Sequence, residues 1–323
     1  THCISSAASD VYKRQEKDDP YGDNQTNEDL TAVKHVQEMQ IIESKDYEKI
    51  KEAVFKYGGV QTSIYNALRS SQSSSPYYNK STDAYCYIGT EKPNHDVVIV
   101  GWDDSYSKDN FNTDLEGDGA FICQNSWGDN FGENGFFYIS YYDTNIGTHN
   151  VVYTDIENTD NYDHIYQSDL CGWVGQLGYN KDSIYGANVF TAEGNETLKA
   201  ASFYATGKDS QYELYVVRQF EDETSLEKMI PVASGKLGNA GYYTVDFNQG
   251  IEVDAGERYA VVLYIITPGS VHPMAIEYAA DEATENVDLD DGESYISANG
   301  SKWVSVDTVE KSNLCIKAFS DNR

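Results

Sequence analysis

The chain has 323 residues, 40% of them hydrophobic, which is enough for two ordinary domains that each bury a core. Its formal net charge is −30, with 53 Asp and Glu against 23 Lys and Arg. Such acidity argues against nucleic acid and anionic membrane surfaces as partners, because both would repel the protein. No apolar run is long enough to span a bilayer. The acidic, Tyr-rich composition, with 27 Tyr, suggests a secreted or wall-associated protein.

The N-terminal part begins with a segment that looks foreign to the rest. Residues 1–15 resemble translated adapter sequence, and we exclude them from fold prediction. Residues 16–45 are polar and acidic. Helical spacing of Ile50, Ala53, Val54 and Tyr57 then predicts a helix over 46–57, with Ser44 or Asp46 as its cap and a glycine pair at its end. Residues 60–65 read as a strand.

Two motifs follow, each leading into or out of a buried strand. The first runs Asn94-His95-Asp96 and continues as an apolar strand over 97–100. The second is Asn125-Ser126-Trp127-Gly128, preceded by an apolar strand over 121–123 and followed by glycines and an aromatic strand. A lone histidine before a strand is usually structural, and a lone Asn-Ser-Trp-Gly is usually a turn. Because both motifs occur in one chain, a catalytic pair of His95 and Asn125 is favoured over two unrelated structural residues.

Together these motifs resemble the right-hand half of the papain-like cysteine peptidases. The resemblance implies that His95 exchanges a proton with a cysteine thiolate, which is the nucleophilic form of the thiol. Asn125 would orient the imidazole, and the Trp127 indole would shield the bond between them from water. It also implies that no metal or organic cofactor is needed.

The nucleophile of that family is not recognisable in this chain. The Cys-Gly-Ser-Cys-Trp type of run is absent, and only Cys3 and Cys86 precede His95. Cys3 lacks the expected neighbours, and Cys86 more plausibly packs or pairs. We therefore expect a truncated chain that is not competent alone, with its cysteine in a missing N-terminal part.

Three residues are expected to line a substrate pocket, namely Asn94, Asp96 and Ser63. Asp96 stands where family members often have a small apolar residue that borders the pocket for the substrate's second side chain before the cut. If Asp96 faces this pocket, its charge favours a basic side chain. The alternative is that Asp96 turns toward solvent.

Other candidate sites have weaker signals. The polar insertion over 103–118 carries Asp114, Glu116 and Asp118, but its spacing does not match an EF-hand loop, and we predict no metal site. Five cysteines give no disulfide framework or metal spacing. Cys171 and Cys315 could pair, although free buried thiols are at least as plausible.

The C-terminal part has a different sequence pattern. Residues 144–163 are polar, as expected for a linker. Short aromatic and β-branched runs then recur, at 200–205, 212–217, 242–247, 259–266, 274–278 and 314–319. Such spacing predicts an antiparallel β-sandwich. Short segments such as Gly292-Glu293-Ser294-Tyr295 resemble the lectin-like domain that is appended to bacterial and archaeal surface peptidases. Trp173 and Trp303 could stack on sugars, although such residues more often fill a core.

We therefore predict a mainly β protein, α+β overall: a right-hand β-barrel half of a papain-like fold over 16–150, followed by a sandwich over 164–321. The predicted function is that of a fragment of an extracellular or cell-surface cysteine endopeptidase, bacterial or archaeal. Its expected partners are a polypeptide substrate and, through the second domain, glycan or cell-wall material. The alternative is a non-catalytic surface adhesin in which a degenerate peptidase half serves as scaffold.

Overall fold

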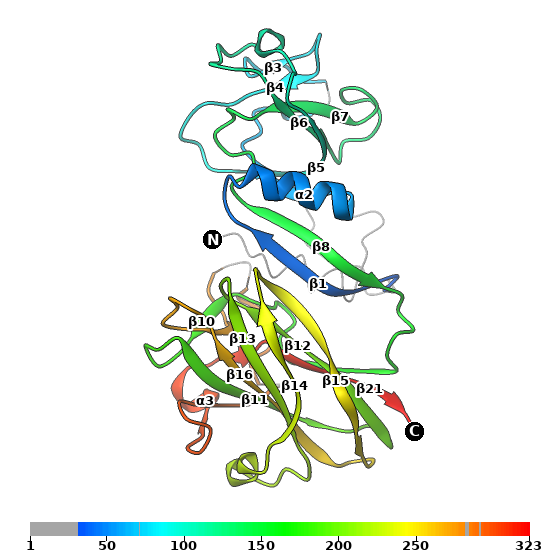
Figure 1. The fold of residues 1–323 in the computed structure, drawn as a ribbon, viewed down its shortest axis with the longest axis vertical. Helices are drawn as coiled ribbons and strands as arrows, with labels where there is room; N and C mark the ends of the chain where they lie inside the picture. The colour runs from blue at the N-terminus through cyan, green and yellow to red at the C-terminus, as the bar shows by residue number, and fades with distance from the viewer. Residues whose placement is uncertain (1–31, 71, 282–283, 291) are drawn as a thin grey trace. The chain divides into compact units, whose positions relative to one another are not determined.

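The computed structural model describes residues 32–323 except 71, 282, 283 and 291. Cys3 and the adapter-like residues 1–15 lie outside this described part. The chain divides into two compact units (Figure 1). Within the described residues, the first unit is Gln40–Thr154, and the second is Asp155–Arg323 together with residues 32–39.

Two strands cross the boundary between the units, and neither was predicted from the sequence. Strand β1 spans His35–Ile42, in the stretch that was interpreted only as polar and acidic. Strand β8 spans Asn150–Glu157, inside the expected linker. The expected linker at 144–163 therefore contains a strand, and the boundary between the two units, after Thr154, also lies within it. In β8, Asn150 and Val152 are buried at alternate positions, which is the burial pattern of a strand.

The helix of the first unit, α2 (Tyr47–Tyr57), begins and ends as its sequence predicts. Asp46 is its cap, and its side chain accepts a hydrogen bond from the main-chain N–H of Lys49. At the other end Gly58 adopts a left-handed conformation with φ of 93°, which is favourable for glycine. The helix buries Ile50, Ala53 and Val54.

Seven strands form the sheet of the first unit. Their order is β3 (Tyr78–Asn79), β4 (Ala84–Tyr85), β7 (Phe136–Ser140), β6 (Ala120–Gln124), β5 (His95–Asp103), β2 (Val60–Ile64) and β8. The pairings within this set are antiparallel, except that β4 and β7 run parallel. A register shift interrupts the pairing of β5 with β6 between Ile99 and Gly101. Lys108–Asn110 forms the short helix η1 in the polar insertion.

Alternation along β5 places one face of this sheet in the core. Val97 and Ile99 are buried, whereas Val98 between them is 37% exposed. Phe121 and Cys123 of β6 are buried in the same hydrophobic cluster. The cluster therefore holds the strands that lead away from His95 and toward Asn125.

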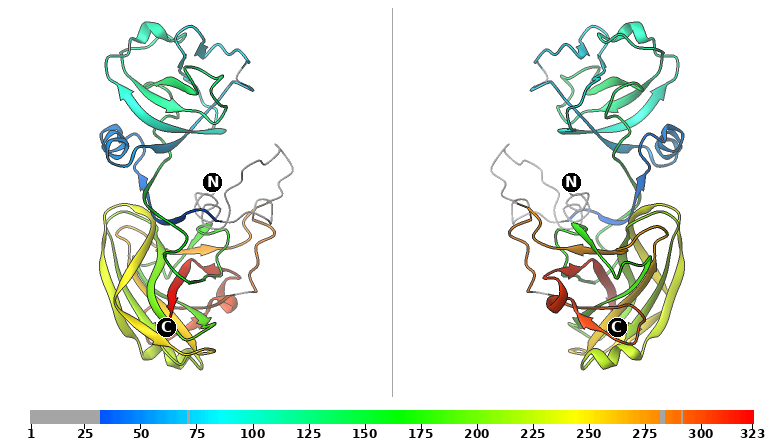
Figure 2. Two further views of the ribbon diagram at one scale, coloured as in Figure 1. Left: turned by 90° about the vertical axis from the view of Figure 1, so that its right-hand side faces the viewer. Right: turned by 90° about the vertical axis from the view of Figure 1, so that its left-hand side faces the viewer.

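Strands form most of the second unit in all three ribbon views (Figures 1 and 2). One sheet has the order β14 (Ile230–Leu237), β13 (Ser210–Val217), β16 (Arg258–Ile266), β11 (Ser183–Thr191), β18 (Glu293–Ser297) and β19 (Val304–Ser305). A second layer contains β15 (Ala240–Val253), β12 (Glu196–Ala205), β21 (Ile316–Asn322) and β9 (His164–Tyr166). A third sheet has the order β10 (Gly175–Leu177), β17 (Met274–Glu277) and β20 (Asn313–Leu314). The short helices η2 and α3 span Glu223–Glu227 and Val306–Val309.

The predicted antiparallel sandwich is confirmed. The strand pairs of the second unit that the structure describes are antiparallel. One hydrophobic cluster unites Leu214 and Val261 from the six-stranded sheet with Phe203 and Ile316 from the second layer. Side chains of two facing layers thus share one core, which is the defining feature of a sandwich.

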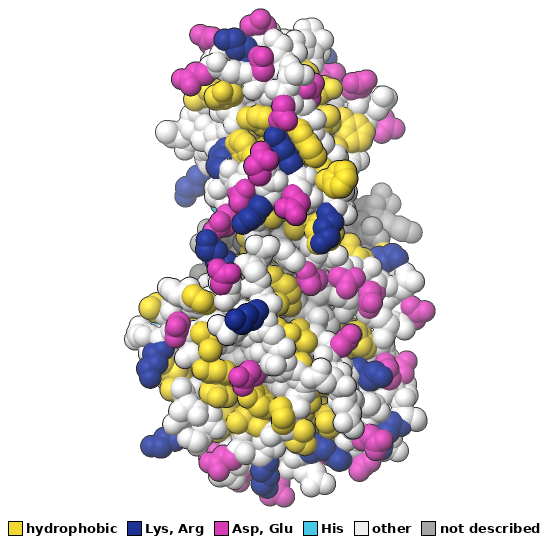
Figure 3. Space-filling model, viewed as in Figure 1, with side chains coloured by type: hydrophobic (Ala, Val, Ile, Leu, Met, Phe, Trp, Pro, Cys, Tyr) yellow, Lys and Arg dark blue, Asp and Glu magenta, His cyan; other side chains and the backbone are white. Residues whose placement is uncertain are grey.

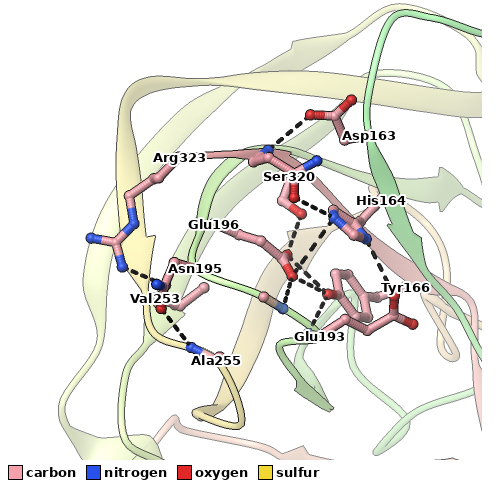
Figure 4. A network of polar contacts seen from close by, with 12 residues as sticks. Asp163, His164, Tyr166, Glu193, Asn195, Glu196, Val253, Ala255, Ser320 and Arg323 are labelled. Carbon is pink, nitrogen blue, oxygen red and sulfur yellow. Dashed lines mark hydrogen bonds and ion pairs between the residues drawn. The ribbon is translucent and has the colours of Figure 1, made fainter.

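A polar network joins strands β9 and β21 of the second unit (Figure 4). The carboxylate of Glu196 is fully buried and accepts hydrogen bonds from Tyr166 Oη, at 2.8 and 2.9 Å, and from Ser320 Oγ, at 2.6 Å. The His164 imidazole lies beside it, 2.9 Å from Asn322 Oδ1 and 3.3 Å from a carboxylate oxygen of Glu193. These bonds connect β9 and β12 to β21.

No disulfide joins Cys171 to Cys315. Among the residues that the structure describes, no helix has the length and apolar character to cross a membrane.

Candidate active site

His95 is the first residue of β5 and is held by the pairing of β5 with β2. In this register Ile64 lies opposite His95, and Ser63 lies opposite Asp96. The main-chain N–H of Asn94 donates to the carbonyl of Ile64 at 3.0 Å, so the pairing continues one residue before the histidine. The imidazole is half-buried at this end of the sheet.

Asn125 directly follows β6, and a glycine-rich loop fixes its position. Its main-chain N–H donates to the carbonyl of Gly135 at 3.0 Å. Gly128, Gly132 and Gly135 all have positive φ, which a residue with a side chain adopts only at a cost. At Gly132 a β-carbon would lie 2.0 Å from the carbonyl oxygen of Phe136, so this turn also has no space for a side chain.

The predicted contact between the two motifs is observed. His95 Nε2 lies 3.0 Å from Asn125 Oδ1, and the Asn125 side chain is buried. An amide oxygen can only accept, so Nε2 carries the hydrogen in this bond. In the neutral ring Nδ1 is then left with a lone pair, and it is the nitrogen that can take a proton from an approaching group. The arrangement can therefore supply an oriented base.

Trp127 packs beside this pair. Its ring centroid lies 5.4 Å from that of His95, with an interplanar angle of 36°. Phe131 in turn packs edge-on against Trp127 at 5.3 Å. Aromatic surface next to the His95–Asn125 bond reduces its contact with water, and a drier environment strengthens a hydrogen bond.

Asn94 is held by two hydrogen bonds to the main chain, and its place in a substrate pocket stays a prediction. Its Oδ1 accepts from the N–H of Asn66 at 2.7 Å, and its Nδ2 donates to the carbonyl of Asn66 at 3.2 Å. Two bonds from one amide fix the chain just before His95 to the loop after β2. The sequence analysis missed Asn66, because no local pattern links two residues 28 positions apart.

The other two predicted pocket residues lie together. Ser63 Oγ donates to Asp96 Oδ1 at 2.7 Å, and Gln61 Nε2 lies 3.4 Å from Asp96 Oδ2. Asp96 is exposed, so its carboxylate is solvated and accessible to a charged group. Whether these residues border bound substrate stays a prediction.

The described thiols are poorly suited to act as nucleophile for His95. Burial raises the pKa of Cys86 to about 12, and burial also raises the pKa of Cys123 well above its usual value. A thiol with a raised pKa is rarely the reactive thiolate at neutral pH. Cys171 and Cys315 belong to the second unit.

No group of three or more His, Cys, Asp or Glu side chains within the described residues could hold a metal ion. In the polar insertion, Asp118 Oδ1 accepts from the main-chain N–H of Lys108 at 2.9 Å, which closes the loop on itself. A pocket of about 270 Å³ lies over β6 and β7, lined by Ile122, Glu133, Asn134, Phe136 and Tyr138. It contains neither His95 nor Asn125, and we assign it no part in the chemistry.

Comparison with known proteins agrees with this geometry. Residues 2–156 match the model of the papain family cysteine proteases, and residues 165–320 match that of a lectin-like domain. Each of these two matches covers just under half of the chain. A search of curated proteins finds no match.

The papain-family and lectin-like parts occur together in solved structures that resemble the whole chain. One is the clostridial cysteine protease Cwp84 after propeptide cleavage, with 28% identity, a TM-score of 0.82, and coverage of 99% of this chain and 81% of the other. Another contains the cysteine protease and lectin-like domains of Cwp84, described as a surface layer associated protein of Clostridium difficile. It has 25% identity, a TM-score of 0.78, and coverage of 99% and 72%. The predicted fold of both parts is therefore confirmed.

Proposed function

We propose that this chain carries the base and the orienting amide of a papain-like cysteine endopeptidase. His95 takes the proton of the attacking thiol and later delivers it to the leaving amine, and Asn125 holds the ring in the tautomer that this requires. The observation that carries the proposal is the 3.0 Å contact between His95 Nε2 and Asn125 Oδ1. The papain-family match over 2–156 supports it independently.

The thiolate is supplied from outside the described residues. Cys86 and Cys123 are buried with raised pKa values, and no hydrogen bond links His95 to either of them in the part of the chain that the structure describes. The proposed nucleophile is therefore a cysteine outside the described residues, at the start of a helix as in the papain family. The polypeptide as written is then not catalytically competent.

One pair of assays tests this function. The chain alone is expected to leave a fluorogenic dipeptide amide intact, whereas the chain joined to its natural upstream sequence cleaves it in a thiol-dependent manner. His95→Ala in the joined protein should abolish cleavage, and His149→Ala, at an exposed histidine of the same unit, should not. Full activity of His95→Ala, or thiol-dependent turnover by the chain alone, contradicts the proposal.

The second unit is proposed to bind carbohydrate at the cell surface. The lectin-like match over 165–320 favours this function, and one relative with both domains is described as surface layer associated. Hydrophobic side chains gather over this unit between scattered charged residues (Figure 3), and aromatic faces suit the C–H groups of sugar rings. Binding to a glycan array tests it. Glycan binding without any peptidase activity of the joined protein would favour the alternative of an adhesin.

A further inference from the structure

Three ionisable side chains are buried together in the second unit, and the proposed functions use none of them. Lys317 is 4% exposed, and Asp169 and Glu277 are 0% exposed. We call these three residues the Lys317 cluster. Charged side chains are seldom fully buried, because the interior replaces the hydration of each ion only in part. A buried Lys–Asp–Glu set therefore calls for a specific chemical reason.

The amine of Lys317 lies directly against the carboxyl group of Asp169. Lys317 Nζ is 2.7 Å from Asp169 Oδ1, although this contact is not aligned as a hydrogen bond. Nζ donates instead to the main-chain carbonyl of Asp169 at 3.3 Å. The carboxyl carbon is bonded to Oδ1, so the amine is one covalent bond away from the carbon that it could attack.

Strand pairing holds this contact in place. Lys317 belongs to β21, which pairs with β9 through Ala318 and Tyr166. Asp169 follows β9 by three residues, and Lys317 also lies opposite Ser202 of β12. Both reacting groups are therefore fixed by the sandwich itself, and such positioning replaces most of the entropy cost of bringing two reactants together.

Burial also favours the uncharged forms that condensation needs. An amine attacks only when it has lost its extra proton, and a carboxyl group accepts attack far better as the acid than as the anion. Desolvation raises the pKa of Asp169. Desolvation also opposes the charged form of Lys317, but the adjacent charges of Asp169 and Tyr242 outweigh it and leave the pKa of Lys317 raised. Passage of one proton from the Lys317 ammonium to the adjacent carboxylate produces the neutral amine and the neutral acid and removes both charges from the interior.

Glu277 is suited to move the remaining protons. It lies on β17, and its carboxylate accepts hydrogen bonds from Asn313 Nδ2, at 3.1 Å, and from the main-chain N–H of Cys171. Burial raises its pKa to about 7, and the charges of Asp169 and Lys317 both act on it. A group with a pKa near the working pH can both accept and release a proton.

We propose that Lys317 and Asp169 form an intramolecular isopeptide bond, with Glu277 as the proton carrier. Nζ attacks the Asp169 carboxyl carbon, a new Nζ–Cγ bond forms, and one Cγ–O bond breaks. Glu277 takes a proton from the nitrogen and passes it to the departing hydroxyl, which leaves as water. An ammonium and a carboxylate thus become one amide and one water molecule, and no oxidant or cofactor is required.

The bond would tie the two ends of the unit together. Asp169 and Lys317 are 148 positions apart, one just after β9 and one on the last strand, β21. A covalent link across so long a loop restricts the unfolded chain and prevents the end strands from separating. This role is independent of peptidase activity and of glycan binding.

Intact-protein mass spectrometry of the purified chain tests the proposal. The expected mass is one water molecule below the sequence mass, and a tryptic digest should contain one branched peptide with Asp169 joined to Lys317. Lys317→Arg, which keeps the charge, and Asp169→Ala should both show the full sequence mass. The exposed Lys199–Asp321 pair, 3.7 Å apart on neighbouring strands, serves as an internal control that should stay unlinked.

The wild-type mass decides the outcome even if a variant fails to fold. Folded wild-type protein that keeps its full sequence mass after prolonged incubation at neutral pH overturns the proposal. Glu277→Gln tests the proton carrier, because it should slow formation of the bond roughly 10²-fold or more and remove its dependence on pH near neutrality. A linked Glu277→Gln protein with an unchanged rate and pH profile contradicts that role.

Discussion

His95 Nε2 and Asn125 Oδ1 lie 3.0 Å apart, although the two residues belong to different strand ends and are 30 positions apart in the chain. The strand pairing of β5 with β6 brings them together, since Val98 pairs with Gln124, the residue just before Asn125. The amide thereby selects the ring nitrogen that carries the hydrogen.

The imidazole tautomer of His95 should depend on Asn125. In wild-type protein, ¹⁵N NMR is expected to show Nε2 protonated and Nδ1 unprotonated in the neutral ring, whereas Asn125→Ala should give a mixture of tautomers because the acceptor is gone. Gln124→Ala, at the exposed neighbour, should leave the tautomer unchanged. In the protein joined to its upstream sequence, Asn125→Ala should reduce kcat on the order of 10²-fold. An unaltered tautomer in Asn125→Ala would refute the orienting role.

Asp96 should give the joined enzyme a preference for a basic side chain at the second position before the cut. Because Asp96 is exposed, a charge pair there is worth up to about 1 kcal/mol, or roughly five-fold in kcat/KM. Asp96→Asn should remove this preference in a peptide-library profile. Ser63→Ala, which removes the hydroxyl bonded to Asp96 but keeps the charge, should have a smaller effect. Equal preference of the wild type for Leu and Arg would count against the assignment.

Gly132 should tolerate substitution much less than Gly128, although both have positive φ. A β-carbon at Gly128 meets nothing within 4 Å. Gly128→Ala should therefore lower the free energy of unfolding only by the backbone strain of the left-handed conformation, about 1–2 kcal/mol. At Gly132 it would lie 2.0 Å from the Phe136 carbonyl oxygen, so Gly132→Ala must displace the main chain of the loop after Asn125. Urea unfolding of both variants measures the difference. If the two variants lose the same amount of unfolding free energy, the loop is not closely packed at Gly132.

The stability of the second unit should fall as pH rises above 6.5 because of His164. The hydrogen bond to Asn322, and the carboxylates of Glu196 and Glu193, raise the pKa of His164 above its usual 6.5. The folded state therefore binds the proton more tightly, so the stabilisation is fully present below pH 6.5 and is lost as pH rises through the raised value. His164→Gln should flatten this part of the stability profile, measured by thermal unfolding between pH 5 and 8.

Its control is His272→Gln, which alters a histidine of the same unit outside the network of Figure 4. In that variant the stability of the protein should change with pH as steeply as in the wild type. An identical slope in His164→Gln would show that other groups cause the pH dependence.

Much of the first unit could be predicted from the sequence because its signals are local. The helical spacing up to Tyr57, the cap at Asp46 and the glycine at 58 fix α2 within a residue of its predicted bounds. The two motifs identified His95 and Asn125 because each ends or begins a strongly apolar strand. The strands of the sandwich core were recognisable for the same reason, although β15 extends well beyond the predicted 242–247.

Other features depended on contacts between distant segments. Strands β1 and β8 were missed because their apolar residues, such as Met39 and Val152, are interspersed with polar ones, and only pairing with other strands decides which of them are buried. The two hydrogen bonds between the Asn94 amide and the main chain of Asn66 were also not predicted.

The sequence by itself determined the two motifs, the helix and the alternating apolar runs, since each depends on residues close together in the chain. Only the tertiary structure decided that Asp169 meets Lys317 and that Glu277 is buried beside them. None of the three stands in a recognisable motif. Their meeting depends on how β9 pairs with β21, and that register is fixed by the packing of a shared core rather than by any local preference.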